Sequence, residues 1–133
     1  MKKIIFVCAE NAGRSQMAEA FFNTLAVGAD VVAESAGTMP AHEVNPVAVE
    51  AMQEKGIDIS SQSPKQFDPT SVNQYERLIS FGCLVKEAFP PDIQERIEDW
   101  DITDPKGKNL AEVRSIRDDI ERRVQTFLDE LQP

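Results

Sequence analysis

Short apolar runs alternate along this chain with segments in which apolar residues recur at helical spacing, and this alternation constrains the fold more than any other feature. The run KIIFV at residues 3–7 is typical of a strand buried on both faces. Apolar residues then recur at helical spacing, at Met17, Ala18, Phe21, Phe22 and Leu25. The first unit is therefore predicted to be a strand followed by a helix.

The same order recurs further along the chain. Residues 30–35 (DVVAES) predict a second strand, and Asn45 and Pro46 predict the cap and first residue of a helix that runs to Lys55 and stops at Gly56. Residues 76–81 (ERLISF) and 98–103 (EDWDIT) predict two more strands. A long final helix is marked by Leu110, Val113, Ile120, Val124, Phe127 and Leu131. This order predicts an α/β fold in three layers, with a parallel sheet that binds ligands beyond the carboxyl ends of its strands.

Length, charge and cysteine content narrow the class of protein. A chain of 133 residues with 41% hydrophobic residues can bury a core, and we expect a single domain over residues 1–133. A formal net charge of -9 argues against nucleic-acid binding, which needs clustered Lys and Arg. Two cysteines are too few for a disulfide framework, and the first residues resemble neither a signal peptide nor a membrane span. We therefore expect a cytoplasmic protein that does not associate with membranes.

The segment CAENAGRS, residues 8–15, lies between the first strand and the first helix. A short loop containing Gly13 at this position can turn backbone N–H groups inward to hold an anion, supported by the helix dipole. Arg14 is unfavourable in the first turn of a helix by roughly 0.3–1 kcal/mol unless an anion offsets its charge. Its fork of donors suits two oxygens of a phosphate-like ion. Cys8 would lie at the floor of this loop as a thiolate nucleophile, with Ser15 donating a hydrogen bond to it.

The alternative interpretation is structural. A free cysteine is often a small buried hydrophobe, and Arg14 would then be a solvated surface residue. The spacing of Cys8 and Arg14 is weak evidence alone, because such pairs arise by chance. A strand before the loop, a glycine within it and a helix after it favour the anion site.

These residues carry a resemblance to a known family. VCAENAGRSQMAEAFF resembles the phosphate-loop signature of the low-molecular-weight protein tyrosine phosphatase superfamily, and RSQMAEAF resembles its arsenate reductase branch. ESAGT, VNPVAVEAMQEKGIDISSQ, WDITDPKGK and the acidic final helix follow in the family's order and cover nearly the whole chain. The resemblance implies a four-stranded parallel sheet flanked by helices.

The resemblance also implies roles for individual residues. It makes Cys8 the nucleophile, Arg14 the anion-binding arginine and Asp104 the general acid, and it implies that Asn11 and Ser15 shape the loop. The substrate-binding residues would be Glu10, Asn11, Ala12, Gly13, Arg14 and Ser15. For Asp104, a carboxylic acid held over an apolar, partly desolvated pocket can protonate a leaving oxygen. The structural alternative is turn chemistry, since Asp-Pro followed by Gly is a common loop signal.

The role of Cys83 decides which of two reactions the protein can catalyse. Reduction of a thiol–arsenate adduct needs a second thiol, whereas hydrolysis of a phosphate ester needs only water. Cys83 follows the third predicted strand, so we expect it at the same edge of the sheet as Cys8. The alternative is a core cysteine at the end of that strand. The chain has Gly13 where many relatives carry another cysteine, and Phe89 near the expected place of a third relay cysteine, so a three-cysteine relay is excluded.

We therefore predict a thiol-dependent arsenate reductase with Cys8, Arg14, Asp104 and Cys83 as catalytic residues. Its partners would be arsenate or phosphate and a reductant, either thioredoxin, glutaredoxin or a small thiol. The alternative enzyme is a phosphatase that hydrolyses phosphate monoesters through a phosphocysteine, although DPKGK lacks the aromatic residues that often follow Asp-Pro in tyrosine phosphatases. A non-enzymatic anion-binding module is a third hypothesis. Cys8, Cys83 and His42 lack zinc-site spacing, and we expect no metal or cofactor.

Overall fold

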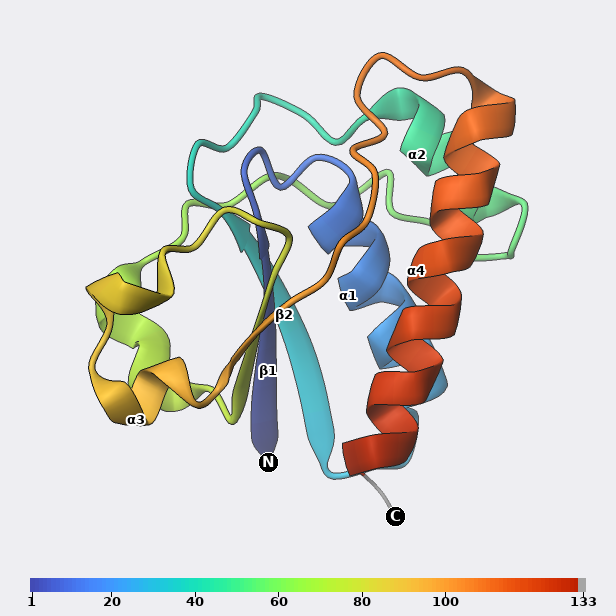
Figure 1. Cartoon of the computed structure of the whole chain (residues 1–133). Coiled ribbons are helices and arrows are strands. Elements are labelled where there is room, and N and C mark those ends of the chain that lie inside the picture. The colour runs from blue at the N-terminus through green and yellow to red at the C-terminus, as the bar shows by residue number, and fades with distance from the viewer. Residues whose placement is uncertain (132–133) are drawn as a thin grey trace.

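Four parallel strands form the central sheet of the computed structural model, which describes residues 1–131 (Figure 1). The strands are β1 (Lys2–Cys8), β2 (Val31–Gly37), β3 (Arg77–Ser80) and β4 (Ile97–Asp99). Their order across the sheet is β2-β1-β3-β4, and every neighbouring pair is parallel. The predicted four-stranded parallel sheet is confirmed.

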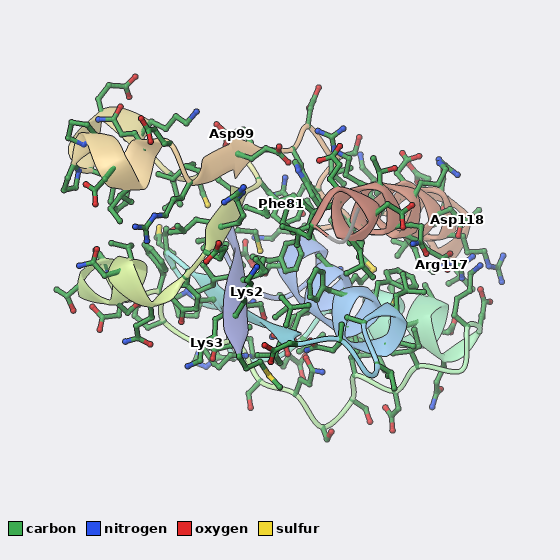
Figure 2. The ribbon with its side chains drawn as sticks, turned by 90° about the horizontal axis from the view of Figure 1, so that it is seen from below. Lys2, Lys3, Phe81, Asp99, Arg117 and Asp118 are labelled. Atoms are coloured by element: carbon green, nitrogen blue, oxygen red, sulfur yellow. The ribbon has the colours of Figure 1, made fainter. Side chains whose placement is uncertain are left out.

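Helices cover both faces of this sheet. They are α1 (Arg14–Leu25), α2 (Pro46–Gln53), η1 (Pro69–Gln74), η2 (Lys86–Ala88), α3 (Pro91–Gln94) and α4 (Leu110–Leu131). Seen from below, α1, α2 and α4 lie on one side of the strands, and α3 lies on the other (Figure 2). The three-layer arrangement predicted from the alternation is therefore confirmed.

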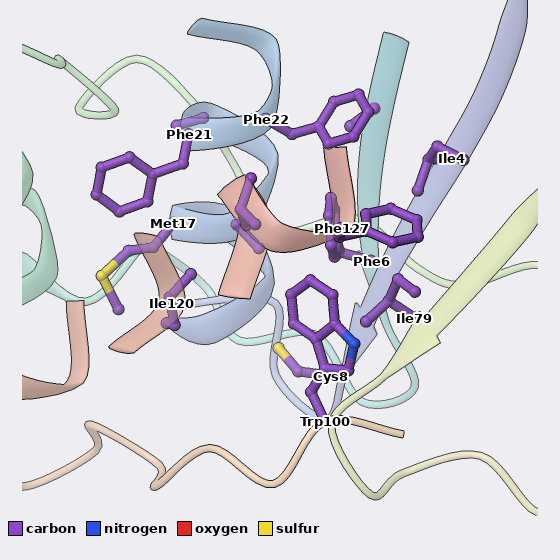
Figure 3. Close-up of a cluster of buried hydrophobic side chains, with 14 of the residues drawn as sticks. Ile4, Phe6, Cys8, Met17, Phe21, Phe22, Ile79, Trp100, Ile120 and Phe127 are labelled. Atoms are coloured by element: carbon purple, nitrogen blue, oxygen red, sulfur yellow. The ribbon is translucent and has the colours of Figure 1, made fainter. Parts of the chain in front are cut away.

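The alternating side chains of β1 divide the core into two clusters. Ile4, Phe6 and Cys8 point toward α1 and α4 (Figure 3). The Phe6 ring packs there against Trp100, with 5.6 Å between the two ring centroids. Ile5 and Val7 pack on the opposite face with residues from the η1 and α3 region. Because β1 is central and buried on both faces, its carboxyl end places Cys8 at a fixed point under the loops.

Some element boundaries differ from the prediction. The fourth strand was expected at residues 98–103 but spans Ile97–Asp99, because β3 ends at Ser80 and leaves no strand for the later residues to pair with. The hydroxyl of Ser80 instead accepts the backbone N–H groups of Cys83 and Leu84, which starts a turn.

Within residues 1–131, no helix is both long enough and apolar enough to cross a bilayer.

Candidate active site

Cys8 is the last residue of β1 and lies at the base of the following loop. Only 3% of the residue is exposed. The backbone N–H of Asn11 donates to the sulfur at 3.2 Å, and the Ser15 hydroxyl oxygen lies 2.8 Å from it. Two donors at a buried sulfur stabilise a negative charge there, as a thiolate nucleophile requires.

Asn11 orders this loop from behind the sulfur. It is fully buried and has a φ of 52°, a left-handed conformation that asparagine tolerates better than most residues. Its side-chain oxygen accepts from Gln16 at 3.1 Å and from the backbone N–H of Lys65 at 2.9 Å. Its amide nitrogen donates to the Ser15 oxygen at 2.7 Å. Because that oxygen already accepts a hydrogen bond, its own proton is free to point at Cys8.

Gly13 precedes α1 and provides no side-chain cap, so the N–H groups of the first helical turn keep free hydrogen-bonding capacity. A Cβ at this position would lie 2.6 Å from Cγ of Pro105, closer than two carbons can approach. The glycine thus lets the loop of residues 104–107 pack directly on the Cys8 loop. In Figure 1 the orange segment leading into α4 runs beside the blue loop that follows β1.

Arg14 is the first residue of α1, and its side chain is 15% exposed. The guanidinium donates to the carbonyl of Ile102 at 3.1 Å and lies 3.8 Å from a carboxylate oxygen of Asp104. Its central carbon lies 5.7 Å from the centroid of the Phe81 ring, at the distance of a cation–π contact. These contacts hold a positive charge beside the nucleophile loop.

A cavity of about 300 Å³ opens above the thiol. The predicted residues that line it are Cys8, Glu10, Ala12, Gly13, Arg14 and Asp104, and the lining residues that the prediction missed include Ala41, Glu43, Asn45, Pro46 and Lys106. Asn11 and Ser15 do not line the cavity, because their side chains lie behind the loop and hold it in place. The packing of the loops places these missed residues in the lining of the cavity, and no motif in the sequence marks them as site residues.

Asp104 lies at the mouth of the cavity. Its side chain is 57% exposed, and the residue lines the cavity that opens above Cys8. One carboxylate oxygen accepts the backbone N–H of Lys106 at 3.0 Å. Asp104 therefore stabilises a turn with one carboxylate oxygen and also lies beside the Arg14 guanidinium.

Cys83 is at the expected edge of the sheet but outside the cavity. Its thiol donates to the carbonyl of Val7 at 3.2 Å, and the residue packs against the cluster on the face opposite Cys8. Burial raises the pKa of the Cys83 thiol, and the charge of Cys8 raises it further, while a hydrogen bond from Ser80 opposes both effects. Both cysteines are free. Cys83 therefore contacts the residue that precedes Cys8 in β1, although the two thiols lie with different core clusters.

The site combines a buried thiol with N–H donors, an arginine and a carboxylic acid around a small cavity. Such a set can bind a tetrahedral oxyanion and attack its central atom with sulfur. Among residues 1–131, no three His, Cys, Asp or Glu side chains gather closely enough to hold a metal ion.

The fold and the site define an α/β protein with a buried free thiol at the base of a small cavity. The model of the low molecular weight phosphotyrosine protein phosphatase family matches residues 3–133. The chain belongs to this family.

Individual relatives cover nearly the whole chain. A glutaredoxin arsenate reductase from Synechocystis sp. is 39% identical over an alignment of 131 residues that covers 96% of this chain and 97% of the relative. A putative arsenate reductase from Halobacterium salinarum is 37% identical over 98% of this chain and 94% of its own. A solved arsenate reductase in the phosphate binding state is 38% identical, with a TM-score of 0.84 and 98% of each chain covered. The YwlE arginine phosphatase from Geobacillus stearothermophilus has a TM-score of 0.86 at 26% identity, over 99% of this chain and 94% of its own.

Proposed function

We propose that this protein is a thiol-dependent arsenate reductase. The observation that carries the proposal is the second free thiol, Cys83, at the carboxyl edge of the sheet, where it donates to the carbonyl of Val7, the residue before Cys8. Relatives named arsenate reductase, at 37–39% identity, support the same assignment, whereas the similar arginine phosphatase is 26% identical.

In the proposed first step the Cys8 thiolate attacks the arsenic atom of arsenate. The Arg14 guanidinium leaves Ile102 and Asp104 to bind two substrate oxygens, and the free N–H groups of the first turn of α1 bind the rest of the charge. A sulfur–arsenic bond forms, and one oxygen leaves as water with a proton donated by Asp104.

In the second step the Cys83 sulfur attacks the Cys8 sulfur. A disulfide forms and the sulfur–arsenic bond breaks, so that its electron pair stays on arsenic, which leaves as arsenite. The thiols together lose two electrons, and thioredoxin, glutaredoxin or a small thiol then reduces the disulfide. The loop around Cys83 has to release its bond to the Val7 carbonyl for the sulfurs to meet. A cycle of this kind needs a reducing compartment, for which we propose the cytoplasm.

A phosphatase is the second candidate, because hydrolysis of a phosphate ester would use Cys8, Arg14 and Asp104 with water in the second step. No aromatic side chain is among the residues that line the cavity within residues 1–131, and aromatic walls are what an aryl ester would need for stacking. This lining favours a substrate without an aryl group.

Replacement of Cys83 by serine distinguishes the two candidates. We expect Cys83→Ser to abolish arsenite release while leaving any hydrolysis of aryl phosphate through Cys8 intact, and Cys8→Ser to abolish both. In the unmodified protein, one turnover with arsenate and no added thiol should give a linked Cys8–Cys83 peptide pair by mass spectrometry. Arsenite formation that needs only external thiol, with both cysteines still free, would remove Cys83 from the mechanism. Hydrolysis of aryl phosphate with no arsenite under any thiol system would establish the phosphatase instead.

A further inference from the structure

An ion pair between Glu10 and Lys106 bridges the two walls of the Cys8 cavity, and we call these two residues the rim pair. Lys106 Nζ lies 2.7 Å from a Glu10 carboxylate oxygen, and both residues line the cavity. We propose that the rim pair closes the mouth of the cavity to large substituents and so restricts access to Cys8 to small ligands such as inorganic oxyanions. Only the identity of the oxyanion rests on the proposed function.

The position of the rim pair follows from the exposure of its members. The side chain of Lys106 is 71% exposed and that of Glu10 38%, whereas Cys8 is 3% exposed. The pair therefore lies at the outer end of a cavity whose floor is the thiol. At about 300 Å³ the cavity is at the lower end of the range for small-molecule sites, and both members of the rim pair line it.

The rim pair is also the contact that can open without dismantling the site. The loop that carries Asp104 meets the Cys8 loop at three places, which are Pro105 on Gly13, Asp104 beside Arg14, and Lys106 on Glu10. The first is close packing, and the second joins groups that a bound oxyanion would engage. The third joins two side chains at the mouth of the cavity that the proposed bond-making steps do not use.

The opposite charges of Glu10 and Lys106 explain both why the rim pair forms and why it can open. The hydrogen bond that Lys106 donates to the Glu10 carboxylate raises the pKa of Lys106, so the ammonium stays charged throughout the neutral range. Unpaired, Glu10 would place a negative charge beside an anion site, and Lys106 neutralises it. Exposed ion pairs are weak and screened by salt, so this one opens readily and opens more often at high ionic strength.

The test measures access to Cys8 with two uncharged alkylating reagents, iodoacetamide and its N-benzyl analogue, in the intact protein. Mass spectrometry of the Cys8 peptide gives the two rates, and their ratio cancels any change in the reactivity of the thiol itself. We expect the ratio of the N-benzyl rate to the iodoacetamide rate to rise about two- to fivefold in Glu10→Ala, in Lys106→Ala and in the double variant, the range set by an exposed ion pair. In the unmodified protein, 1 M KCl should raise the same ratio.

Lys108→Ala is the matched control, because Lys108 is in the same loop and takes part in none of the ion pairs found within residues 1–131. Its ratio should equal that of the unmodified protein. An unchanged ratio in the rim-pair variants would overturn the proposal. So would rates for both reagents that change by one common factor, since that result means that Glu10 and Lys106 only tune the charge around the thiol. A ratio that rises in the variants but ignores salt would also overturn it, because the closure would then not be ionic.

A second measurement asks whether the rim pair selects between ligands. Protection of Cys8 against iodoacetamide reports binding of inorganic phosphate and of phenylphosphonate, which needs no turnover and therefore does not depend on arsenate reduction. The rim-pair variants should improve the affinity for phenylphosphonate relative to phosphate by the same two- to fivefold. Equal changes for both anions would show an effect of charge alone and would count against selection by size.

Discussion

Gly13 is the residue at which the Cys8 loop packs directly on the Asp104 loop. Because a Cβ there would lie 2.6 Å from Pro105 Cγ, the Gly13→Ala variant has to displace the Asp104 loop. Overpacking of this kind destabilises by about 1–3 kcal/mol, and we expect that loss in urea denaturation. We also expect weaker protection of Cys8 by phosphate, because Asp104 and Arg14 shift together.

The clash has a specific remedy, which serves as the control. Adding Pro105→Ala to Gly13→Ala removes the atom that the new methyl group meets, so part of the lost stability and of the phosphate affinity should return. If the double variant is no better than Gly13→Ala alone, contact with Pro105 is not why glycine occupies this position.

The single residues that sequence could predict are those tied to a regular element. Cys8 ends a buried strand and Arg14 begins a helix, so the local pattern determines that both face the same loop. Lys106 and Pro105 lie in an irregular segment, and their contacts with Glu10 and Gly13 join positions more than ninety residues apart. No periodicity encodes such contacts, so the roles of Lys106 and Pro105 at the rim could not be predicted, whereas Glu10 and Asp104 were identified only through the family resemblance.

At the scale of elements, α2 is attached to α4 by a charged group at its carboxyl end. Glu54 accepts hydrogen bonds from Arg114 and Arg117, which lower its pKa to about 2. The side chain of Arg117 is only 8% exposed and also donates to the Ala51 carbonyl at 2.8 Å. That carbonyl belongs to the last turn of α2, where helical partners are missing. Figure 2 shows Arg117 on α4.

The Arg117→Met variant tests this attachment. Methionine keeps most of the packing but leaves the Ala51 carbonyl and Glu54 without their buried donor, so we expect a loss of about 1–3 kcal/mol in the free energy of unfolding. Arg122→Met is the control, because Arg122 pairs with Asp119 on the exposed side of α4 and should change stability by less than about 0.5 kcal/mol. Equal losses in the two variants would show that Arg117 contributes no more than a surface charge.

The strands and helices that the sequence predicts correctly are those whose position depends mainly on the burial of apolar residues. The strands β1, β2 and β3 are buried and mostly apolar, and α4 has a strong apolar stripe, so each lies where the pattern placed it. The helices η1, η2 and α3 have three to six residues each, too few for helical periodicity to be visible. The error at β4 has a different origin, because the length of a strand depends on its partner, and β3 ends at Ser80, which pairs with Asp99.

At the scale of the whole molecule, a partly buried carboxylate links stability to pH. Glu19 of α1 accepts a hydrogen bond from Ser35 of β2, on the face of the sheet that carries α1. Burial raises the pKa of Glu19 above its usual 4.5, and Glu34 adds to this rise, while the bond from Ser35 and the charge of Lys65 oppose it. The folded protein therefore holds the Glu19 proton to higher pH than the unfolded chain does.

The sign of the effect on stability follows from proton binding. Between pH 4.5 and the higher folded pKa, the native state binds more protons at Glu19 than the unfolded state, so this residue makes the free energy of unfolding fall as pH rises. The Glu19→Gln variant has no such proton, and its stability relative to the unmodified protein should increase with pH across that window and then level off. Urea denaturation of both proteins at several pH values from 4 to 8 measures the difference. A difference that stays constant, or that falls with rising pH, would mean that Glu19 is ionised in the folded protein at no cost from burial.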